Sequence, residues 1–273
     1  MNENERNVSS VDNKSSDFQR RTEPNFAWGN AADILQELIA LRGGWTMGPS
    51  GSGGNTVIDT SGGGYHLSRN SNPNHGLDGL VPYVNFDGSN DELYYLNNAQ
   101  FNITGQELST VGTYRGLMLG GWFWFDDDPT LADQEHLIGI WSTVLADRAY
   151  RIVRLTDGTI RFQIGNGVAT PGVASTTVAV SGQWYFCAAR WDPNVLEYIY
   201  VGTTNGTLEI VSGATIAAPI VTSAANFTIG AMLAGTDDRM DGRASHCWVC
   251  ASQSASHTLI KSIFHHQRAM FGS

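Results

Sequence analysis

The stretch LMLGGWFWF, from Leu117 to Phe125, decides the fold of this chain. Its aromatic-rich composition suits a pleated strand and is poor material for a helix. Successive strand residues point to opposite faces, and here both faces are apolar. One face carries Leu117, Leu119, Gly121, Phe123 and Phe125, and the other carries Met118, Trp122 and Trp124. Apolar residues on both faces predict a central strand that is covered on each side.

Segments of similar character recur through the chain. Residues 81–93 read VPYVNFDGSNDEL and residues 183–192 read QWYFCAARWD. Asp157-Gly158 and Asn205-Gly206 are strong signals for two-residue hairpin turns. Strands are expected at residues 65–68, 82–87, 92–96, 117–126, 136–142, 149–155, 159–165, 175–180, 183–191, 196–202, 207–211, 226–230 and 243–251. This pattern predicts an all-β chain whose antiparallel strands form a two-sheet jelly-roll sandwich.

The two ends of the chain differ from this pattern. Residues 1–28 form a polar arm with too few apolar groups to fold alone. Residues 29–43 are expected to form a leading helix, with Asn30 as its N-cap and apolar residues at helical spacing. Residues 44–273 are expected to form one sandwich domain that ends in a helix over 254–271, since large β-sandwiches commonly form one domain.

Charge and hydropathy exclude several classes of partner. The chain has 16 Lys and Arg against 26 Asp and Glu, a net charge of -10. Nucleic acid is not expected as a partner, because phosphate binding requires clustered Lys and Arg. No apolar run approaches the roughly 18–20 residues of a membrane span, and the N-terminus lacks the apolar region of a signal peptide. We therefore expect no membrane partner, synthesis in the cytoplasm, and release only by lysis or within a particle.

Three cysteines occur, and two of them form a C-x-x-C pair at Cys247 and Cys250. The pair could indicate redox chemistry or half of a zinc site. In a strand over 243–251, however, residues three apart point to opposite faces. We therefore expect both side chains, like Cys187, to be small buried hydrophobes.

Several segments, in this order, resemble the LamG-like jelly rolls of the concanavalin A-like lectin/glucanase superfamily. The first is DTSGGGYHL, which begins at Asp59, and the second is VNFDGSNDEL, which begins at Val84. GGWFWF resembles the central core strand of the family, and QWYFCAARWD resembles its later tryptophan strand. FTIGA and MDGRA resemble the closing strands. The resemblance covers about residues 43–271 and implies the same antiparallel sandwich, with a C-terminal helix.

The resemblance also implies a calcium site. Such domains often hold one calcium ion between an early loop aspartate and oxygens near the closing strand. Asp59 and Asp241 match these positions, and backbone carbonyls would complete the oxygen shell. The alternative is that both are turn-forming aspartates beside glycine. No other cofactor is expected.

A glucanase of this superfamily requires two carboxylates facing the scissile bond, commonly as Glu-x-Asp-x-x-Glu on a strand. That pattern does not occur, and Asp126-Asp127-Asp128 is expected to be a loop because Pro129 follows it. No catalytic residue is predicted, and the chain is not expected to be an enzyme. Sugar binding would use exposed aromatic side chains. The candidates, which the sequence does not separate from core residues, are Trp45, Tyr65, Tyr94, Tyr95, Trp141 and Trp191.

The segments LRGGW, LVPYVNFDG and the closing DGRA resemble those of LamG-like proteins encoded among phage structural genes. This resemblance implies a virion structural protein, either a capsid decoration protein or a tail-associated subunit. Its expected partners are other virion proteins and further copies of the same chain. Phe26, Trp28, Ile34 and Leu38 are expected to bind the neighbouring subunits. The alternative is a lectin-like adhesion module that binds surface glycans, and a glycan hydrolase is the third choice.

Overall fold

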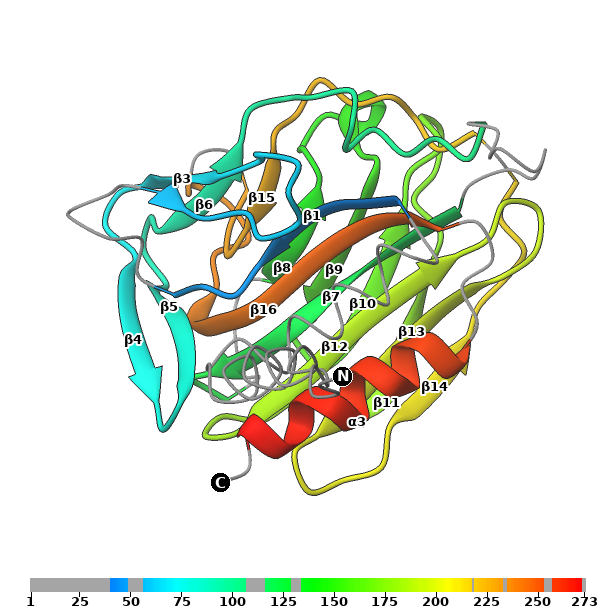
Figure 1. Ribbon diagram of the computed structural model, residues 1–273. Helices are drawn as coiled ribbons and strands as arrows, with labels where there is room; N and C mark the ends of the chain where they lie inside the picture. Colours follow the sequence, from blue (N-terminus) through cyan, green and yellow to red (C-terminus); the bar gives the residue numbers. More distant parts are fainter. Residues whose placement is uncertain are drawn as a thin grey trace, which may run out of the picture.

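The structure is a computed structural model that describes residues 40–48, 56–106, 116–128, 134–217, 219–232, 235–252 and 257–271. Two antiparallel sheets face each other, and one α-helix lies on the outer face of one of them (Figure 1). The all-β sandwich predicted from the sequence is confirmed, together with its C-terminal helix. No helix among the described residues is long and apolar enough to cross a membrane.

Sheet A contains the central strand. In spatial order it consists of β14 (Glu209–Ser212), β13 (Glu197–Thr203), β12 (Trp184–Trp191), β7 (Gly116–Phe125), β16 (Asp241–Ser252), β5 (Val81–Asp87) and β4 (Asn74–Asp78). β1 (Ala40–Trp45) pairs with the second half of β16, beyond the segment that pairs with β5. β7 therefore lies between β12 and β16, as the apolar character of both its faces predicts.

Sheet B closes the other side of the sandwich. In spatial order it consists of β11 (Gly172–Val178), β10 (Thr159–Ile164), β9 (Tyr150–Arg154), β8 (Glu135–Ile140), β15 (Phe227–Ile229), β6 (Glu92–Tyr95), β3 (Leu67–Asn70) and β2 (Thr56–Val57). A 3₁₀ turn, η1 (Leu145–Asp147), interrupts the connection from β8 to β9. The inner faces of the two sheets enclose the main hydrophobic core.

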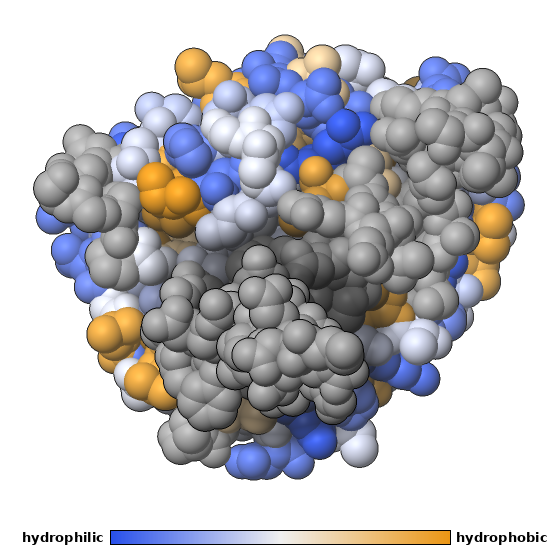
Figure 2. Space-filling view, viewed as in Figure 1, coloured by the Kyte–Doolittle hydropathy of each residue, from blue (hydrophilic) through white to orange (hydrophobic). Residues whose placement is uncertain are grey.

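The outer face of sheet A is covered by α3 (His257–Phe271). Met118 and Trp122 of β7 are fully buried in a second apolar cluster with Ile260 and Phe264 of this helix. The Trp122 Nε1 group donates a 3.0 Å hydrogen bond to Gln267 Oε1, so the buried indole nitrogen is satisfied. One strand thus supplies side chains to two separate cores. Among the coloured atoms of the face in Figure 2, hydrophobic side chains form small separate groups.

Each expected strand overlaps a strand of the structure, but β1, β2 and β4 were not predicted. The expected leading helix does not extend to residue 43, because Ala40–Trp45 is β1 and pairs with Cys247–Ala251 of β16. Pairing with a distant strand here outweighs the local helical pattern. Residues 29–39 and the arm over 1–28 lie outside the described residues.

The cysteine prediction is confirmed. All three cysteines are free and fully buried. Cys247 faces the main core and Cys250 faces the cluster under α3, as expected for a strand, although a bulge separates Ser245 from Trp248. Burial raises the pKa of both thiols, which keeps them protonated and unreactive at neutral pH.

Candidate functional site

A polar pocket with a volume of about 470 Å³ lies on the outer face of sheet B. Its floor is formed by β9 and β10, and its walls by the segments around Trp141, Arg148 and Asp238. We call it the Arg151 pocket, after the residue at its centre. Almost all of its lining side chains can donate or accept hydrogen bonds. Such a surface suits a ligand that is itself rich in polar groups.

Alternation along the floor strands places two polar side chains in the pocket. Arg151 and Gln163 are direct partners in the β9–β10 ladder. Their neighbours Ile152 and Phe162 point into the main core, so Arg151 and Gln163 point away from it. The Arg151 Nε group donates a 2.8 Å hydrogen bond to Gln163 Oε1. This bond orients the amide and leaves its Nε2 group with no protein partner among the described residues.

The other donors of Arg151 hold the pocket together. The guanidinium forms an ion pair with Asp238 and donates a 2.9 Å hydrogen bond to Gln134 Oε1. Burial lowers the pKa of Arg151, and the nearby Asp238 opposes this shift. The side chain is only 7 % exposed, so its charge is held in a fixed place. Gly139 makes this packing possible, since a Cβ at its φ of +151° would meet Arg151 Cα at 2.6 Å.

The connection from β8 to β9 forms one wall. Arg148 donates hydrogen bonds from Nε to Ser142 O at 2.8 Å and from Nη2 to Thr143 O at 2.9 Å. Trp141 lies beneath two guanidinium groups, 5.7 Å from Arg148 and 4.6 Å from Arg151. It is only 4 % exposed. The wall is therefore a rigid cation–aromatic stack in which Trp141 supports the arginines and offers no open ring face.

The opposite wall is the loop that carries Asp237 and Asp238. Asp238 has a φ of +43°, a conformation that Asp tolerates better than most residues. Its backbone N–H group donates to Asp237 Oδ1 at 3.1 Å. Its backbone carbonyl accepts a 2.7 Å hydrogen bond from the backbone N–H group of His136. Local backbone strain of this kind is common at functional sites. The loop holds the Asp238 carboxylate against Arg151.

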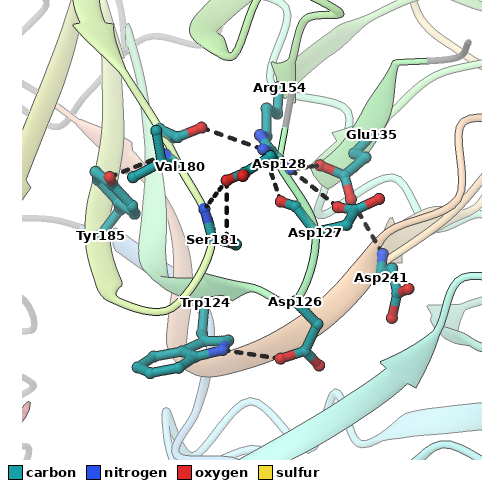
Figure 3. A network of polar contacts seen from close by, with 11 residues as sticks. Trp124, Asp126, Asp127, Asp128, Glu135, Arg154, Val180, Ser181, Tyr185 and Asp241 are labelled. Atoms are coloured by element: carbon teal, nitrogen blue, oxygen red, sulfur yellow. Dashed lines mark hydrogen bonds and ion pairs between the residues drawn. The ribbon is translucent and has the colours of Figure 1, made fainter. Parts of the chain in front are cut away.

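A second polar cluster lies at the end of β9 and is shown in Figure 3. We call it the Arg154 network. Arg154 is fully buried and donates 2.7 Å, 3.0 Å and 3.1 Å hydrogen bonds to Glu135 Oε2, Asp127 O and Ala179 O. Its guanidinium also lies 4.3 Å from the Phe125 ring centroid. Protein groups surround this arginine, so its contacts join loops and strands.

The carboxylates of this network have unequal environments. Burial raises the pKa of Glu135 to about 7, although Arg154 opposes the shift. Asp128 accepts hydrogen bonds from Ser181 N at 3.0 Å and from Ser181 Oγ at 2.8 Å, and these bonds lower its pKa. Residues 126–128 form an irregular segment, as the sequence predicts. Through the two hydrogen bonds from Ser181, Asp128 holds this segment against the turn that precedes β12.

The two predicted calcium ligands are not brought together. Asp59 accepts four hydrogen bonds of 2.8–3.0 Å from Gly44, Ser61 and Tyr65, which occupy both carboxylate oxygens. Gly44 pairs with Trp248, seven residues along β16 from Asp241, a separation of roughly 20 Å. Among the described residues, no group of three or more His, Cys, Asp or Glu side chains could hold a metal ion. Asp59 is a turn-forming residue that ties its loop to β1.

Asp241 begins β16 in acidic surroundings. Its backbone N–H group donates a 3.1 Å hydrogen bond to Glu135 Oε1. Burial raises the pKa of its carboxyl group, and Asp127, Asp126 and Asp87 raise it further. The contact with Glu135 joins Asp241 to the Arg154 network (Figure 3).

The other predicted site residues have mixed outcomes. Trp45 and Trp191 are fully buried in the main core, so they offer no platform for a sugar. Tyr65, Tyr94 and Tyr95 are partly exposed, and none of them lines the Arg151 pocket. The candidate partner-binding residues Phe26, Trp28, Ile34 and Leu38 lie outside the described residues.

Sequence reasoning did not identify the Arg151 pocket. One local signal was present, because TIRFQI places Arg161 and Gln163 on the face opposite Ile160, Phe162 and Ile164. A polar face on an otherwise buried strand can indicate a binding surface. The segments that form the walls come from distant parts of the chain, and no spacing rule joins them.

No family model matches the chain, and no curated protein matches it. Solved structures share its fold. The binding domain of Paraclostridial Mosquitocidal Protein 1 has a TM-score of 0.62 at 11% identity, and covers 86% of this chain. A structure of botulinum neurotoxin type C, whose cell entry depends on interaction with two ganglioside molecules, has a TM-score of 0.60 at 12% identity and covers 87%. An arabinofuranosidase complexed with arabinofuranosyl-alpha-1,2-xylobiose has a TM-score of 0.54 at 14% identity and covers 80%.

The chain spans about half the length of these structures, 52% of the first two and 51% of the third. At such low identity the likeness shows a shared β-sandwich fold. One sandwich architecture serves both binding domains and an enzyme, so function must be argued from the site.

Proposed function

We propose that this chain is a non-enzymatic, lectin-like domain that binds a carbohydrate in the Arg151 pocket. The observation that carries the proposal is the set of fixed, planar polar groups on the pocket floor. Arg151, Gln163 and Gln134 are joined by hydrogen bonds of 2.8 Å and 2.9 Å, so their orientations are set before a ligand arrives. Preorganised donors and acceptors reduce the entropy lost on binding.

The chemistry of the pocket suits a polyhydroxylated ligand. Hydroxyl groups both donate and accept, and the pocket offers amide, guanidinium, carboxylate and hydroxyl groups within one volume of about 470 Å³. Gln163 Nε2 is a donor with no protein partner among the described residues. Recognition here would rest on hydrogen bonds, because the Trp141 ring is covered by two arginines.

The shared fold supports a binding role for the chain. The sandwich fold occurs in receptor-binding domains, including one from a neurotoxin whose entry depends on gangliosides. Because this chain spans only about half of that structure, the position of the ganglioside sites is not transferred to it. The likeness therefore supports a binding domain as the class of protein, and the location of the site is argued from the Arg151 pocket.

A non-catalytic role agrees with the placement of the carboxylates. A glycosidase requires two of them on either side of the scissile bond, about 5–10 Å apart. In the Arg151 pocket the acidic side chains are the adjacent Asp237 and Asp238, and Asp238 is paired with Arg151. Glu135 is buried beside Arg154 in the separate network. Release of reducing ends from oligosaccharides incubated with the full chain would contradict this part of the proposal.

The test is a glycan array followed by calorimetric titration of the full chain with the best ligand. We expect Arg151→Met and Gln163→Ala each to weaken binding at least tenfold. Arg243→Met is the matched control, because that guanidinium stacks on Tyr83 and Trp124 at 4.9 Å on the outer face of sheet A. Equal affinity of all three variants, or no glycan binding at all, would overturn the proposal.

The virion-subunit function predicted from the sequence remains a separate prediction. It depends on the arm over 1–28, which lies outside the described residues. Deleting this arm should abolish incorporation into a particle and leave glycan binding unchanged if both predictions hold. Incorporation of the truncated chain at normal occupancy would reject the virion role only.

A further inference from the structure

We infer that the Arg151 pocket selects a sugar that carries a single carboxylate, and that Arg148 receives this carboxylate. The inference rests on the proposed function and specifies its ligand class. It starts from the two arginines of the pocket, which have different electrostatic partners. Arg151 is ion-paired with Asp238, whereas Arg148 has no acidic partner within 4.0 Å among the described residues.

Arg148 is held in place without losing its charge. Two of its donors bind the backbone carbonyls of Ser142 and Thr143, and its guanidinium lies over the Trp141 ring. Carbonyl oxygens and an aromatic face orient a guanidinium but leave its positive charge uncompensated. Nη1 and the second hydrogen of Nη2 stay available, and this geometry suits a carboxylate. An immobilised cation with open donors at a pocket wall favours an anionic group on the ligand.

The backbone around Arg148 fixes the position of that wall. A Cβ at Gly165 would lie 1.6 Å from Arg148 O, so only glycine allows the end of β10 to approach so closely. The Gly165 N–H group donates a 2.8 Å hydrogen bond to Ala149 O at the same point. The start of β9 is therefore clamped to β10, and Arg148 projects from a rigid base beside the floor residues Arg151 and Gln163.

The balance of charge limits the ligand to one acidic group. The pocket holds one arginine without an acidic partner, the acidic Asp237 and Asp238 line the same cavity, and the whole chain carries a net charge of -10. A polyanion such as a sulfated polysaccharide would meet repulsion that one arginine does not offset. A sugar with one carboxylate gains the Arg148 contact and keeps its hydroxyl groups for Gln163 and Arg151. Uronic and sialic acids share this chemistry.

The experiment compares matched pairs of ligands that differ in their carboxylates. Galacturonic acid is titrated against galactose, and sialyllactose against lactose, so that each acidic ligand carries one carboxylate, with heparin as the polyanion. We expect the full chain to prefer the acidic member of at least one pair about tenfold, and heparin to bind more weakly. Raising the salt from 50 mM to 500 mM should reduce the preference, because added ions screen the contact.

Variants then assign the preference to Arg148. In Arg148→Gln the acidic and neutral members of each pair should bind with equal affinity. Arg148→Lys should keep part of the preference, since it retains the charge but loses the fork of donors. The control Arg243→Gln should behave like the unmodified chain.

The outcomes separate this inference from the proposed function. Binding of neutral and acidic members with equal affinity would overturn the acidic-sugar inference and leave the lectin-like function in place. The acidic-sugar inference also fails if Arg148→Gln retains the preference or if heparin binds best. Absence of binding by every sugar would overturn the proposed function, and this inference with it.

Discussion

Arg151 and Arg154 lie three residues apart on the same strand, β9, yet their side chains occupy opposite faces of the sheet and make different kinds of contact. Arg151 points out of sheet B into a pocket, where its 7 % exposed side chain orients Gln163 and Gln134. Arg154 points to the inner side, is fully buried, and contacts Glu135, the carboxylate of Asp127, two backbone carbonyls and the Phe125 ring. Under the proposed function, a buried arginine indicates a binding site only where donors around it remain open to a ligand. Four predictions test this comparison.

The largest effect is expected from Arg154→Met at pH 8. Removing the cation leaves the Glu135 carboxylate buried without its partner, which costs about 3–5 kcal/mol of stability. Urea unfolding followed by tryptophan fluorescence measures the change. The double variant Arg154→Met, Glu135→Leu should recover much of the loss, because both charges are then absent. Retention of full stability by the single variant would show that the ion pair is not structural.

The second prediction concerns pH. Burial raises the pKa of Glu135 in the folded protein to about 7, above its unfolded value near 4.5. The folded state therefore binds more protons than the unfolded state between these values, and this group makes stability fall as pH rises from about 4.5 to 7. In Glu135→Gln that decline should be reduced by on the order of 2 kcal/mol. Unfolding curves at pH 5 and pH 7.5 compare the two proteins, and parallel pH profiles would reject the assignment.

An opposite trend should come from the buried histidines at more acidic pH. Burial lowers the pKa of His136 to about 3 and that of His246 to about 4. Below pH 6.5 the unfolded state therefore binds more protons than the folded state, until the pH reaches the folded pKa of each histidine. The free energy of unfolding consequently decreases as the pH falls from about 6.5 toward these values. His136→Gln should reduce the loss measured between pH 6.5 and pH 4. His265→Gln is the control, since that side chain is exposed on α3.

The smallest stability effect is expected from Arg151→Met, at about 1–2 kcal/mol, because the released Asp238 is near the surface and can be solvated. Its effect on glycan affinity should be larger than that of Arg154→Met measured under conditions where both proteins are folded. Calorimetric titration beside urea unfolding gives both quantities. The comparison fails if Arg154→Met weakens glycan binding as much as Arg151→Met does.

Much of the sandwich could be predicted from local patterns. Both faces of LMLGGWFWF are apolar, and β7 indeed supplies Phe123 to the main core and Trp122 to the cluster under α3. The three-residue spacing of Cys247 and Cys250 predicted opposite faces, as the structure shows. The strand β1 was not predicted, because its pairing with β16 joins residues about 200 positions apart. The two calcium candidates also lie far apart, since the Asp59 carboxylate accepts hydrogen bonds from Gly44 of β1 and from Tyr65 of its own loop.

The sequence alone determined most of the strands, the terminal helix and the covered position of β7, because these follow from side-chain periodicity within a few residues. It did not determine which arginine of β9 lines the pocket. In YRIVR each face of the strand carries an arginine beside an apolar residue, so the local pattern is ambiguous. Only the tertiary structure pairs Arg151 with Gln163 and Arg154 with Glu135 through hydrogen bonds. The physical reason is that each partner is provided by another strand, and strand pairing is decided by the packing of the whole sandwich.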